Sequence, residues 1–189
     1  MKIVLMRHGK PEVDLEALLK HRVSAFQVGE IVKEYEMSGL SKDSKPYSSA
    51  IDEVKASGFV ICSDLPRAVQ SVEVLGGRHK SLIDENFRES SLPYLNSTWP
   101  RLSLYAYFLL FRMAWLLGFS TNGESIRAAR IRAASNASKL KELAQTHDSV
   151  VLLGHGIMNR LIARELVKSG WRREERSDEG YWSYTVFQN

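Results

Sequence analysis

Three short runs of apolar residues recur along this 189-residue chain, and each ends at a cluster of polar residues. The runs span Ile3 to Met6, Phe59 to Cys62 and Val150 to Leu153, and they are rich in β-branched side chains. Continuous apolar runs of this length are typical of strands that are buried on both faces of a parallel sheet. The pattern therefore predicts three parallel central strands.

Helix-length segments separate these runs. The segment from Asp14 to Glu36 is mostly helical in pattern, Pro66 to Leu75 begins with a proline at a first-turn position, and Ile126 to Gln145 is rich in Ala, Lys, Arg and Leu. The polar stretch from Ser38 to Ser49 predicts a loop, and the alternation of aromatic and polar residues from Tyr181 to Phe187 predicts an edge strand. Alternating strands and helices predict an α/β fold, a three-layer sandwich with helices on both faces of a largely parallel sheet.

Composition narrows the class of protein further. A chain of this length with 44% hydrophobic residues predicts a single domain over residues 1–189. The net charge is only +4 and the basic residues are scattered, so we expect no nucleic-acid partner and only a weak preference for anions. The single cysteine, Cys62, excludes an internal disulfide and a multi-cysteine zinc site, and its place in an apolar run predicts a core residue. The apolar start of the chain is too short for a signal peptide, so we expect a cytoplasmic protein.

One long apolar stretch, residues 102–119, is nearly long enough to span a membrane, but it carries Arg112 near its middle. A guanidinium is costly at that depth, and the rest of the chain has the pattern of one soluble domain. We therefore interpret the stretch as a buried or substrate-covering helix within an insertion over 92–121. Membrane association or partner binding through 102–119 stays open as the alternative.

Polar residues with a shared chemistry follow the three predicted strands. The first run leads into Arg7-His8-Gly9, the second into Ser63 to Arg67, and the third into Gly154-His155-Gly156. Ligands of open α/β sheets bind outside the carboxyl ends of the strands, so we expect these arginines and histidines to meet in one region. Guanidinium groups match phosphate oxygens, and an imidazole can attack phosphorus. The sequence therefore predicts a site for a doubly charged oxyanion.

Motifs at these positions resemble those of the histidine phosphatase superfamily (phosphoglycerate mutase-like, branch 1). MRHGKPE resembles the signature around a phosphorylated histidine, SDLPRAVQS resembles the second arginine motif, and LLGHGIMNR resembles the second histidine motif, with Gly154 where serine is usual. Glu89, in NFRESSLP, lies where the family has its acidic proton donor, and Gly123-Glu124-Ser125 opens a helix. The motifs follow the family's order and reach both ends of the chain.

The resemblance implies a metal-independent phosphatase that needs no cofactor and hydrolyses phosphomonoesters. His8 would carry the phosphoryl group, His8, Arg7, Arg67 and His155 would bind the phosphate, and Glu89 would act as general acid and then general base. Elementary chemistry supports these roles, because a histidine with an ordinary pKa of about 6.5 has a free ring nitrogen near neutral pH. Arginines can neutralise the charge on the transferred group.

Alternatives remain at this stage. The carboxylates Glu73, Asp84 and Glu85 compete with Glu89 for the role of acid, whereas His21, His79 and His147 have no motif context and are predicted to be surface residues. The substrate could be a small phosphorylated metabolite or a phosphoprotein. The chain could also be a mutase-type phosphotransferase, or a phosphate-binding regulatory module without turnover. Aromatic residues of the insertion could line the site or pack in the core; they are Tyr94, Trp99, Tyr105, Tyr107, Phe108, Phe111 and Trp115.

Overall fold

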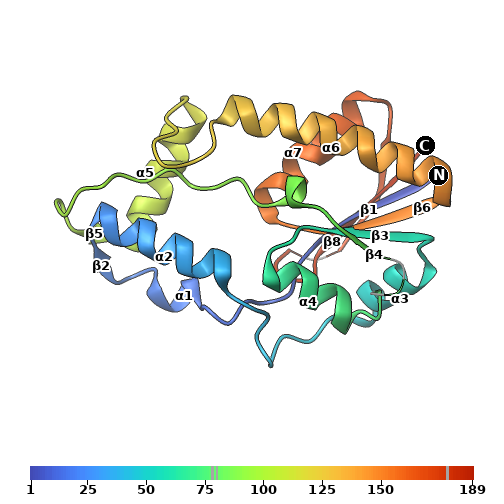
Figure 1. Cartoon of the computed structure of the whole chain (residues 1–189), viewed down its shortest axis with the longest axis horizontal. Coiled ribbons are helices and arrows are strands. Elements are labelled where there is room, and N and C mark those ends of the chain that lie inside the picture. The colour runs from blue at the N-terminus through green and yellow to red at the C-terminus, as the bar shows by residue number, and fades with distance from the viewer. Residues whose placement is uncertain (78, 80, 178) are drawn as a thin grey trace.

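The central sheet of the computed structural model is built from the three predicted strands and three others (Figure 1). The structure describes residues 1–77, 79, 81–177 and 179–189, and within these the strand order is β4–β3–β6–β1–β8–β7. The first four are parallel to one another, whereas β8 is antiparallel to both β1 and β7. Their bounds are β1 Lys2–Arg7, β3 Phe59–Cys62, β4 Ser81–Ile83, β6 Ser149–Gly154, β7 Arg172–Arg176 and β8 Tyr184–Gln188.

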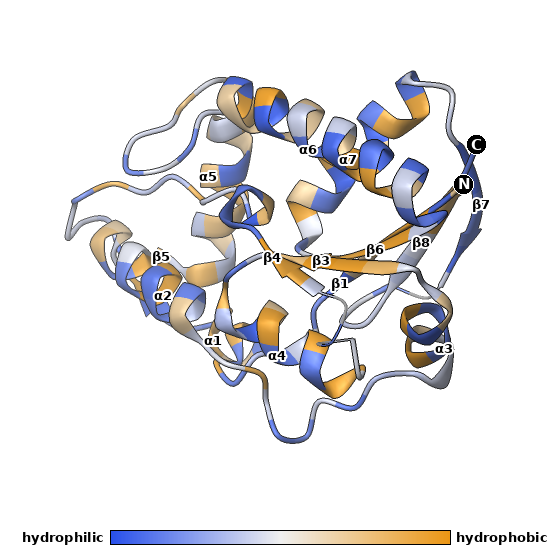
Figure 2. Ribbon diagram, turned by 45° about the vertical axis from the view of Figure 1, so that its right-hand side comes forward, coloured by the Kyte–Doolittle hydropathy of each residue, from blue (hydrophilic) through white to orange (hydrophobic). Residues whose placement is uncertain are grey.

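Side chains of the central strands alternate between two hydrophobic cores, one on each face of the sheet. Ile3 and Leu5 of β1 pack in the core under α6 (Ile126–His147) and α7 (Gly156–Lys168). Val4 and Met6 pack in the other core, against α3 (Ser48–Ala56) and α4 (Pro66–Val74). Burial on both faces explains why these strands have continuous apolar sequences, which are the orange strands of Figure 2. The predicted α/β fold with helices on both faces is confirmed.

Helix starts near the site follow from local sequence. Ser125 is the N-cap of α6, and its hydroxyl accepts a hydrogen bond from the Ala128 amide, as expected for a serine before a helix. Glu124 does not cap this helix; its carboxylate binds the guanidinium of Arg132 instead. Pro66 begins α4, where its missing N–H costs nothing.

A smaller group of elements lies beyond the carboxyl ends of the parallel strands (Figure 1). It contains α1 (Leu15–Leu18), β2 (Arg22–Val23), α2 (Ala25–Met37), β5 (Leu102–Ser103) and α5 (Leu104–Leu116), and β2 pairs with β5. A third hydrophobic cluster, centred on Val28, Leu104 and Phe111, joins α2 to α5. The 3-10 helix η2 (Glu85–Phe87) and an extended segment lead from β4 into this group. This group, which faces the carboxyl ends of the strands, is therefore built from two parts of the chain. One part precedes α3 and the other follows η2.

The segment from Asp14 to Glu36 is mostly helical, as predicted, but β2 divides it into α1 and α2, and Ser24 caps α2 through its hydroxyl. One expectation about secondary structure is wrong. The last strand is not an edge strand, because β8 lies between β1 and β7. The edge is β7, an exposed strand of sequence RREER that has no apolar pattern to reveal it. Charged side chains on an edge strand discourage pairing with other chains, which explains this composition.

The apolar stretch 102–119 is divided between β5, α5 and the following turn. No helix among the described residues is both long enough and apolar enough to cross a membrane. Core packing accounts for Tyr107, Phe111 and Trp115, which are buried, and in part for Tyr94 and Phe108. Trp99 and Tyr105 are 79% and 60% exposed, so these two rings are not part of the core.

Candidate active site

The three strand ends bring the predicted residues together. Arg7 is the last residue of β1 and is followed by His8, Arg67 is the second residue of α4, and His155 lies between β6 and α7. His8, Arg67 and His155 are each at most 2% exposed. The rings of His8 and His155 are 4.9 Å apart between centroids, and Arg67 contacts both histidines. The carboxyl ends of neighbouring parallel strands meet at one sheet edge, which is the reason for this convergence.

The ring of His8 is oriented by the backbone beside it. Its Nδ1 is 2.7 Å from the carbonyl oxygen of Gly9. A carbonyl oxygen only accepts hydrogen bonds, so this contact assigns the ring hydrogen to Nδ1 and leaves a lone pair on Nε2. The Nε–H of Arg67 donates to that nitrogen over 3.2 Å. His8 is therefore held with its unprotonated nitrogen directed at a cation.

Arg67 is anchored by the end of α2. Its Nη1 donates to the carbonyl oxygens of Tyr35 and Glu36 at 2.9 and 3.0 Å, and its guanidinium lies 4.6 Å from the centre of the Tyr35 ring. The last carbonyls of a helix are unpaired within the helix and carry partial negative charge, so a buried guanidinium is stabilised there. These contacts leave Nε and Nη2 directed toward His8 and His155.

His155 is positioned by Ser63, the residue that follows β3. The Oγ of Ser63 and the Nε2 of His155 are 2.6 Å apart. On the other side of the ring, Nη2 of Arg67 is 3.5 Å from Nδ1. A guanidinium has only donors, so Nδ1 faces Arg67 with a lone pair and Nε2–H donates to the serine hydroxyl. The second histidine is thus turned toward the same guanidinium as the first.

Arg7 contributes a second cation from the end of β1. Its guanidinium lies over the ring of Tyr181 at 4.4 Å from the ring centre, and Tyr181 is also 5.9 Å from the ring centre of His8. The Nε of Arg7 is buried and has no hydrogen-bond partner among the described residues. A buried N–H donor without a partner is costly, so this atom is a ready donor to an anion.

Glu89 lies on the extended segment after η2 and contacts the first turn of α7. Its two carboxylate oxygens accept hydrogen bonds from the amides of Ser90, Ile157 and Met158, each at 2.9 Å. A carboxylate has about four acceptor sites, so these three donors leave room for one more partner. A Cβ placed on Gly156 would be 3.8 Å from Oε2 of Glu89 and 4.0 Å from Nε of Arg7. The structure therefore brings Glu89 to the same site as Arg7.

The competing carboxylates are placed differently. Asp84 is bound to Lys139 at 2.7 Å and caps η2, and Glu73 and Glu85 are exposed. Cys62 is buried, and burial raises the pKa of its thiol to about 12, as fits a core residue. Of the other histidines, His21 and His79 are exposed, and His147 is half-buried, stacked on Phe59. The described residues contain no group of three or more His, Cys, Asp or Glu side chains arranged to hold a metal ion.

Gly154, which replaces the serine usual in the resembling motif, is explained by its neighbour Asn159. A Cβ at position 154 would lie 2.4 Å from the Oδ1 of Asn159, closer than atoms can approach. The amide nitrogen of the Asn159 side chain donates to the carbonyl of Met6 over 3.0 Å, which fixes its position against β1. With Asn159 held in this position, there is no room for a serine side chain at position 154.

Sequence reasoning missed four residues of the site. Tyr35 and Tyr181 stack on the arginines, Ser63 orients His155, and none of them stands out in a sequence. Arg112 of α5 does carry a signal, because it is a lone arginine in an apolar helix. Its Nη1 is buried without a partner among the described residues, and its guanidinium lies 4.8 Å from the ring centre of Trp115. Burial lowers the pKa of Arg112, and the Glu89 carboxylate opposes that shift, so the two charges interact.

Both site histidines are held in the neutral form. Burial and the charge of Arg67 lower the pKa of His8 from 6.5 to about 3. Burial, His8 and the arginines lower the pKa of His155 well below its ordinary value. Neutral imidazoles beside two arginines leave the site positive and keep the lone pair of His8 available at neutral pH. Such a site suits a dianion, whose charge would compensate the arginines.

This burial predicts an acid-labile fold. In the unfolded chain both histidines take up protons below about pH 6.5, whereas in the folded protein His8 stays neutral down to about pH 3. The unfolded state thus binds more protons in this window, and the free energy of unfolding falls as pH falls, by about 1.4 kcal/mol per pH unit for His8 alone. Urea unfolding at pH 7 and pH 5 measures the slope. The slope should be smaller in His8→Asn and unchanged in His21→Asn, which removes an exposed histidine; equal slopes in both variants would contradict the prediction.

Comparison with known proteins places this geometry in context. Residues 46–188, well over half of the chain, match the model described as histidine phosphatase superfamily (branch 1). The matched range includes Arg67, Glu89 and His155, whereas Arg7 and His8 precede it. No curated protein sequence matches the chain significantly.

Solved structures share the fold at low sequence identity. An open reading frame product from Mycobacterium tuberculosis has a TM-score of 0.61 and 16% identity, with 98% of this chain and 89% of that chain covered. A mycobacterial glucosyl-3-phosphoglycerate phosphatase has a TM-score of 0.59 and 21% identity over 98% and 91% of the two chains. A phosphoserine phosphatase mutant from Entamoeba histolytica has a TM-score of 0.59 and 17% identity over 98% and 89%. At these identities the likeness establishes the fold alone.

Proposed function

Because this chain belongs to the histidine phosphatase superfamily (branch 1), we propose that it is a phosphatase that hydrolyses a phosphomonoester through a covalent phosphohistidine on His8. The observation that carries the proposal is the orientation of His8. Its Nδ1 is bound to the Gly9 carbonyl, and its free Nε2 faces Arg67 in a buried site with His155, Arg7 and Glu89. A histidine held in this way has an unprotonated ring nitrogen that can attack phosphorus, which supports the role of nucleophile.

In the first step, Nε2 of His8 attacks the phosphorus atom and the bond from phosphorus to the ester oxygen breaks. The hydrogen bond from Arg67 to Nε2 gives way as the phosphoryl group enters, and Arg67 and Arg7 then donate to the phosphoryl oxygens. The positive charge of the two guanidinium groups, placed against these oxygens, stabilises the transition state. The leaving oxygen takes a proton from Glu89, which must carry that proton when the substrate binds.

In the second step, water attacks the phosphohistidine. Glu89, now a carboxylate, accepts a proton from the water, the phosphorus–nitrogen bond breaks, and the electron pair returns to Nε2 of His8. Inorganic phosphate leaves and Glu89 is protonated again. The fold of the Glu89 loop against the first turn of α7 serves both steps, because it holds one carboxylate beside the same oxygen position throughout.

The two named neighbours are described as phosphatases, which favours hydrolysis over phosphoryl transfer to a second substrate. We accordingly propose a small phosphorylated molecule or a phosphoprotein as substrate, with no activating metal. Residues 1–189 would act as one domain, with 92–121 covering the site. A cytoplasmic location stays a prediction, and association with a partner or a membrane surface through 102–119 stays the alternative to a buried or substrate-covering helix.

An assay with p-nitrophenyl phosphate in EDTA tests the proposed function. We expect steady release of inorganic phosphate, together with an acid-labile phosphoprotein after rapid quenching. A phosphoprotein that persists until an acceptor is added would instead indicate a phosphotransferase. Phosphate binding with neither product nor phosphoprotein would indicate a regulatory module without turnover.

The role of Glu89 predicts a defect that depends on the leaving group. In Glu89→Gln, hydrolysis of alkyl phosphates should fall by about 100- to 10,000-fold, because the alkoxide needs a proton. Attack on p-nitrophenyl phosphate should be largely spared, because its phenolate leaves without help, and phosphohistidine should accumulate. Rates on the two esters and the phosphoprotein level give the measurement.

Glu85→Gln and Asp84→Asn serve as controls for the loss of a nearby carboxylate. Glutamine at position 89 would also place an amide N–H₂ group, a donor, near the N–H donors of Ile157 and Met158, which lowers the stability of the fold. Such a loss of stability would reduce the rates on both esters equally. The difference between the esters is therefore the diagnostic readout. Full activity of Glu89→Gln on alkyl phosphates, or the same dependence in a control, would assign the acid to another residue.

A further inference from the structure

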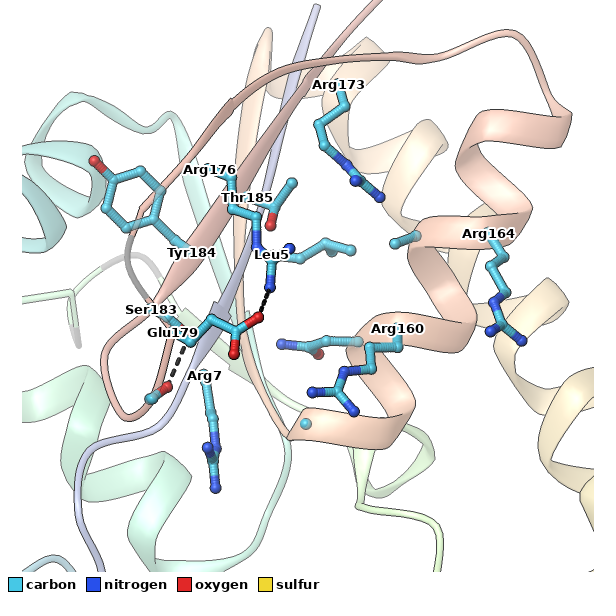
Figure 3. A pocket seen from close by; sticks show the side chains of 14 residues that line it. Leu5, Arg7, Arg160, Arg164, Arg173, Arg176, Glu179, Ser183, Tyr184 and Thr185 are labelled. Atoms are coloured by element: carbon cyan, nitrogen blue, oxygen red, sulfur yellow. Dashed lines mark hydrogen bonds and ion pairs between the residues drawn. The ribbon is translucent and has the colours of Figure 1, made fainter. Parts of the chain in front are cut away.

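A cavity lined by arginines adjoins the candidate active site on the side of α7 and β7 (Figure 3). Its volume is about 320 Å³, which lies within the range of small-molecule sites. Arg160 and Arg164 reach it from α7, Arg173 and Arg176 from β7, and Arg7 from β1. Figure 3 shows Arg160, Arg173 and Arg176 extending into the space between these elements, with Arg164 farther out on the helix.

The charge of this cavity is poorly balanced. Among the described residues that line it, Glu179 is the one acid, and it binds Arg176 at 2.6 Å. In the part of the chain that the structure describes, neither Arg160 nor Arg173 forms an ion pair with an acidic side chain, and the guanidinium of Arg173 lies 5.9 Å from the centre of the Phe187 ring. Cations that converge from two elements repel one another unless an anion lies between them. The cavity therefore suits a group with at least two negative charges.

Arg7 and Gly156 connect the cavity with the candidate active site, because both line the cavity and a Cβ on Gly156 would lie 4.0 Å from Nε of Arg7. The proposed mechanism places the leaving oxygen beside Glu89, whose Oε2 is 3.8 Å from the position of a Cβ on Gly156. A substrate that extends from Glu89 past Gly156 reaches the arginine cavity, because Gly156 lines it.

We propose that the arginine cavity binds a second phosphoryl group of the substrate, so that the preferred substrates carry a phosphomonoester at one end and another phosphate at the other. This inference rests on the proposed function, because it takes the leaving oxygen to lie beside Glu89. Arg160 and Arg173 are the residues that distinguish such substrates. Guanidinium groups donate paired hydrogen bonds to phosphate oxygens, which gives both affinity and orientation.

The test compares hexanediol bisphosphate with hydroxyhexyl phosphate, two esters whose leaving oxygen is the same primary alkoxide on a six-carbon chain and which differ only in the group at the far end. We expect kcat/KM of the wild-type protein to be roughly 10- to 100-fold higher for the bisphosphate, as one or two charge-assisted contacts provide. Arg160→Met with Arg173→Met should remove this preference while the rate on hydroxyhexyl phosphate changes little. Arg172→Met with Arg127→Met is the charge-matched control, because neither residue lines the cavity.

The outcomes separate the inference from the proposed function. Equal kcat/KM for the two esters in the wild type, or an equal loss of preference in the control variant, would overturn the second phosphate site. If the protein hydrolyses no ester at all, the proposed function fails, and calorimetric titration of both esters still tests the cavity. Tighter binding of hexanediol bisphosphate that disappears only in the Arg160 and Arg173 variant would support it; equal binding of the two esters would overturn it.

Discussion

His8→Ala should lower the hydrolysis of p-nitrophenyl phosphate by roughly 10⁵-fold or more, which is the scale of loss when a catalytic nucleophile is removed. Without an imidazole at this position no phosphohistidine can form, and alanine offers no group that attacks phosphorus. Arg7, Arg67 and His155 remain in place, so the variant should still bind phosphate. Steady-state rates, acid-labile phosphate on the protein and thermal stabilisation by phosphate are the measurements.

His21→Ala is the matched control, because it removes an exposed histidine outside the site. Its rate should equal that of the wild type. The His8 variant loses the ring that accepts from Arg67 Nε, so its stability must be measured beside its activity. Substantial turnover by a folded His8→Ala protein, or formation of a phosphoprotein by this variant, would remove His8 from the role of nucleophile.

Arg67→Ala is expected to reduce kcat/KM by roughly 100- to 1,000-fold, as does the loss of one preorganised donor to a developing negative charge. It should also destabilise the fold, because the carbonyls of Tyr35 and Glu36 lose their donor, at about 1–3 kcal/mol for each buried group left unpaired. Arg67→Lys should recover little of either property, since an ammonium cannot reach His8, His155 and the end of α2 at once.

Arg88→Ala provides the comparison for Arg67. Arg88 also forms charged hydrogen bonds, to Asp64, but its side chain is 50% exposed, so its loss should change activity and stability little. Vanadate or phosphate affinity, kcat/KM and urea unfolding are measured for all variants. Unchanged vanadate affinity in Arg67→Ala would show that this guanidinium does not share an anion site with Arg7.

The central part of the fold was predictable because its signals are local. A strand buried on both faces must be apolar throughout, so Ile3–Met6, Phe59–Cys62 and Val150–Leu153 stand out in the sequence. The convergence of Arg7, His8, Arg67 and His155 was predictable for a related reason, because parallel strands end at a common edge. Glu89 lies outside those strand ends, and only its resemblance to a family motif indicated it.

The features that the sequence did not predict depend on neighbouring strands and not on local sequence patterns. β7 is a strand because β8 offers it a hydrogen-bonding edge, and its five charged residues have no period that would indicate a strand. The prediction that Tyr181–Phe187 forms an edge strand failed for the same reason, since β7 covers its outer side. The break between α1 and α2 follows from the pairing of β2 with β5, because these two strands are far apart in the sequence and no local pattern indicates that they pair.

By itself, the sequence determined the α/β class and the set of polar residues at the carboxyl edge of the sheet, because burial and strand direction impose these on any chain with this pattern. Only the tertiary structure decided which nitrogen of His8 is free, because that depends on the Gly9 carbonyl and on Arg67. It also decided that α2 anchors Arg67 and that Glu89 contacts α7. The arginine cavity between α7 and β7 likewise exists only in three dimensions, since its residues are scattered in a sequence whose net charge is only +4. The distances between these groups and the balance of charge around them are set by contacts between segments that are far apart in the sequence, so no local sequence pattern predicts them.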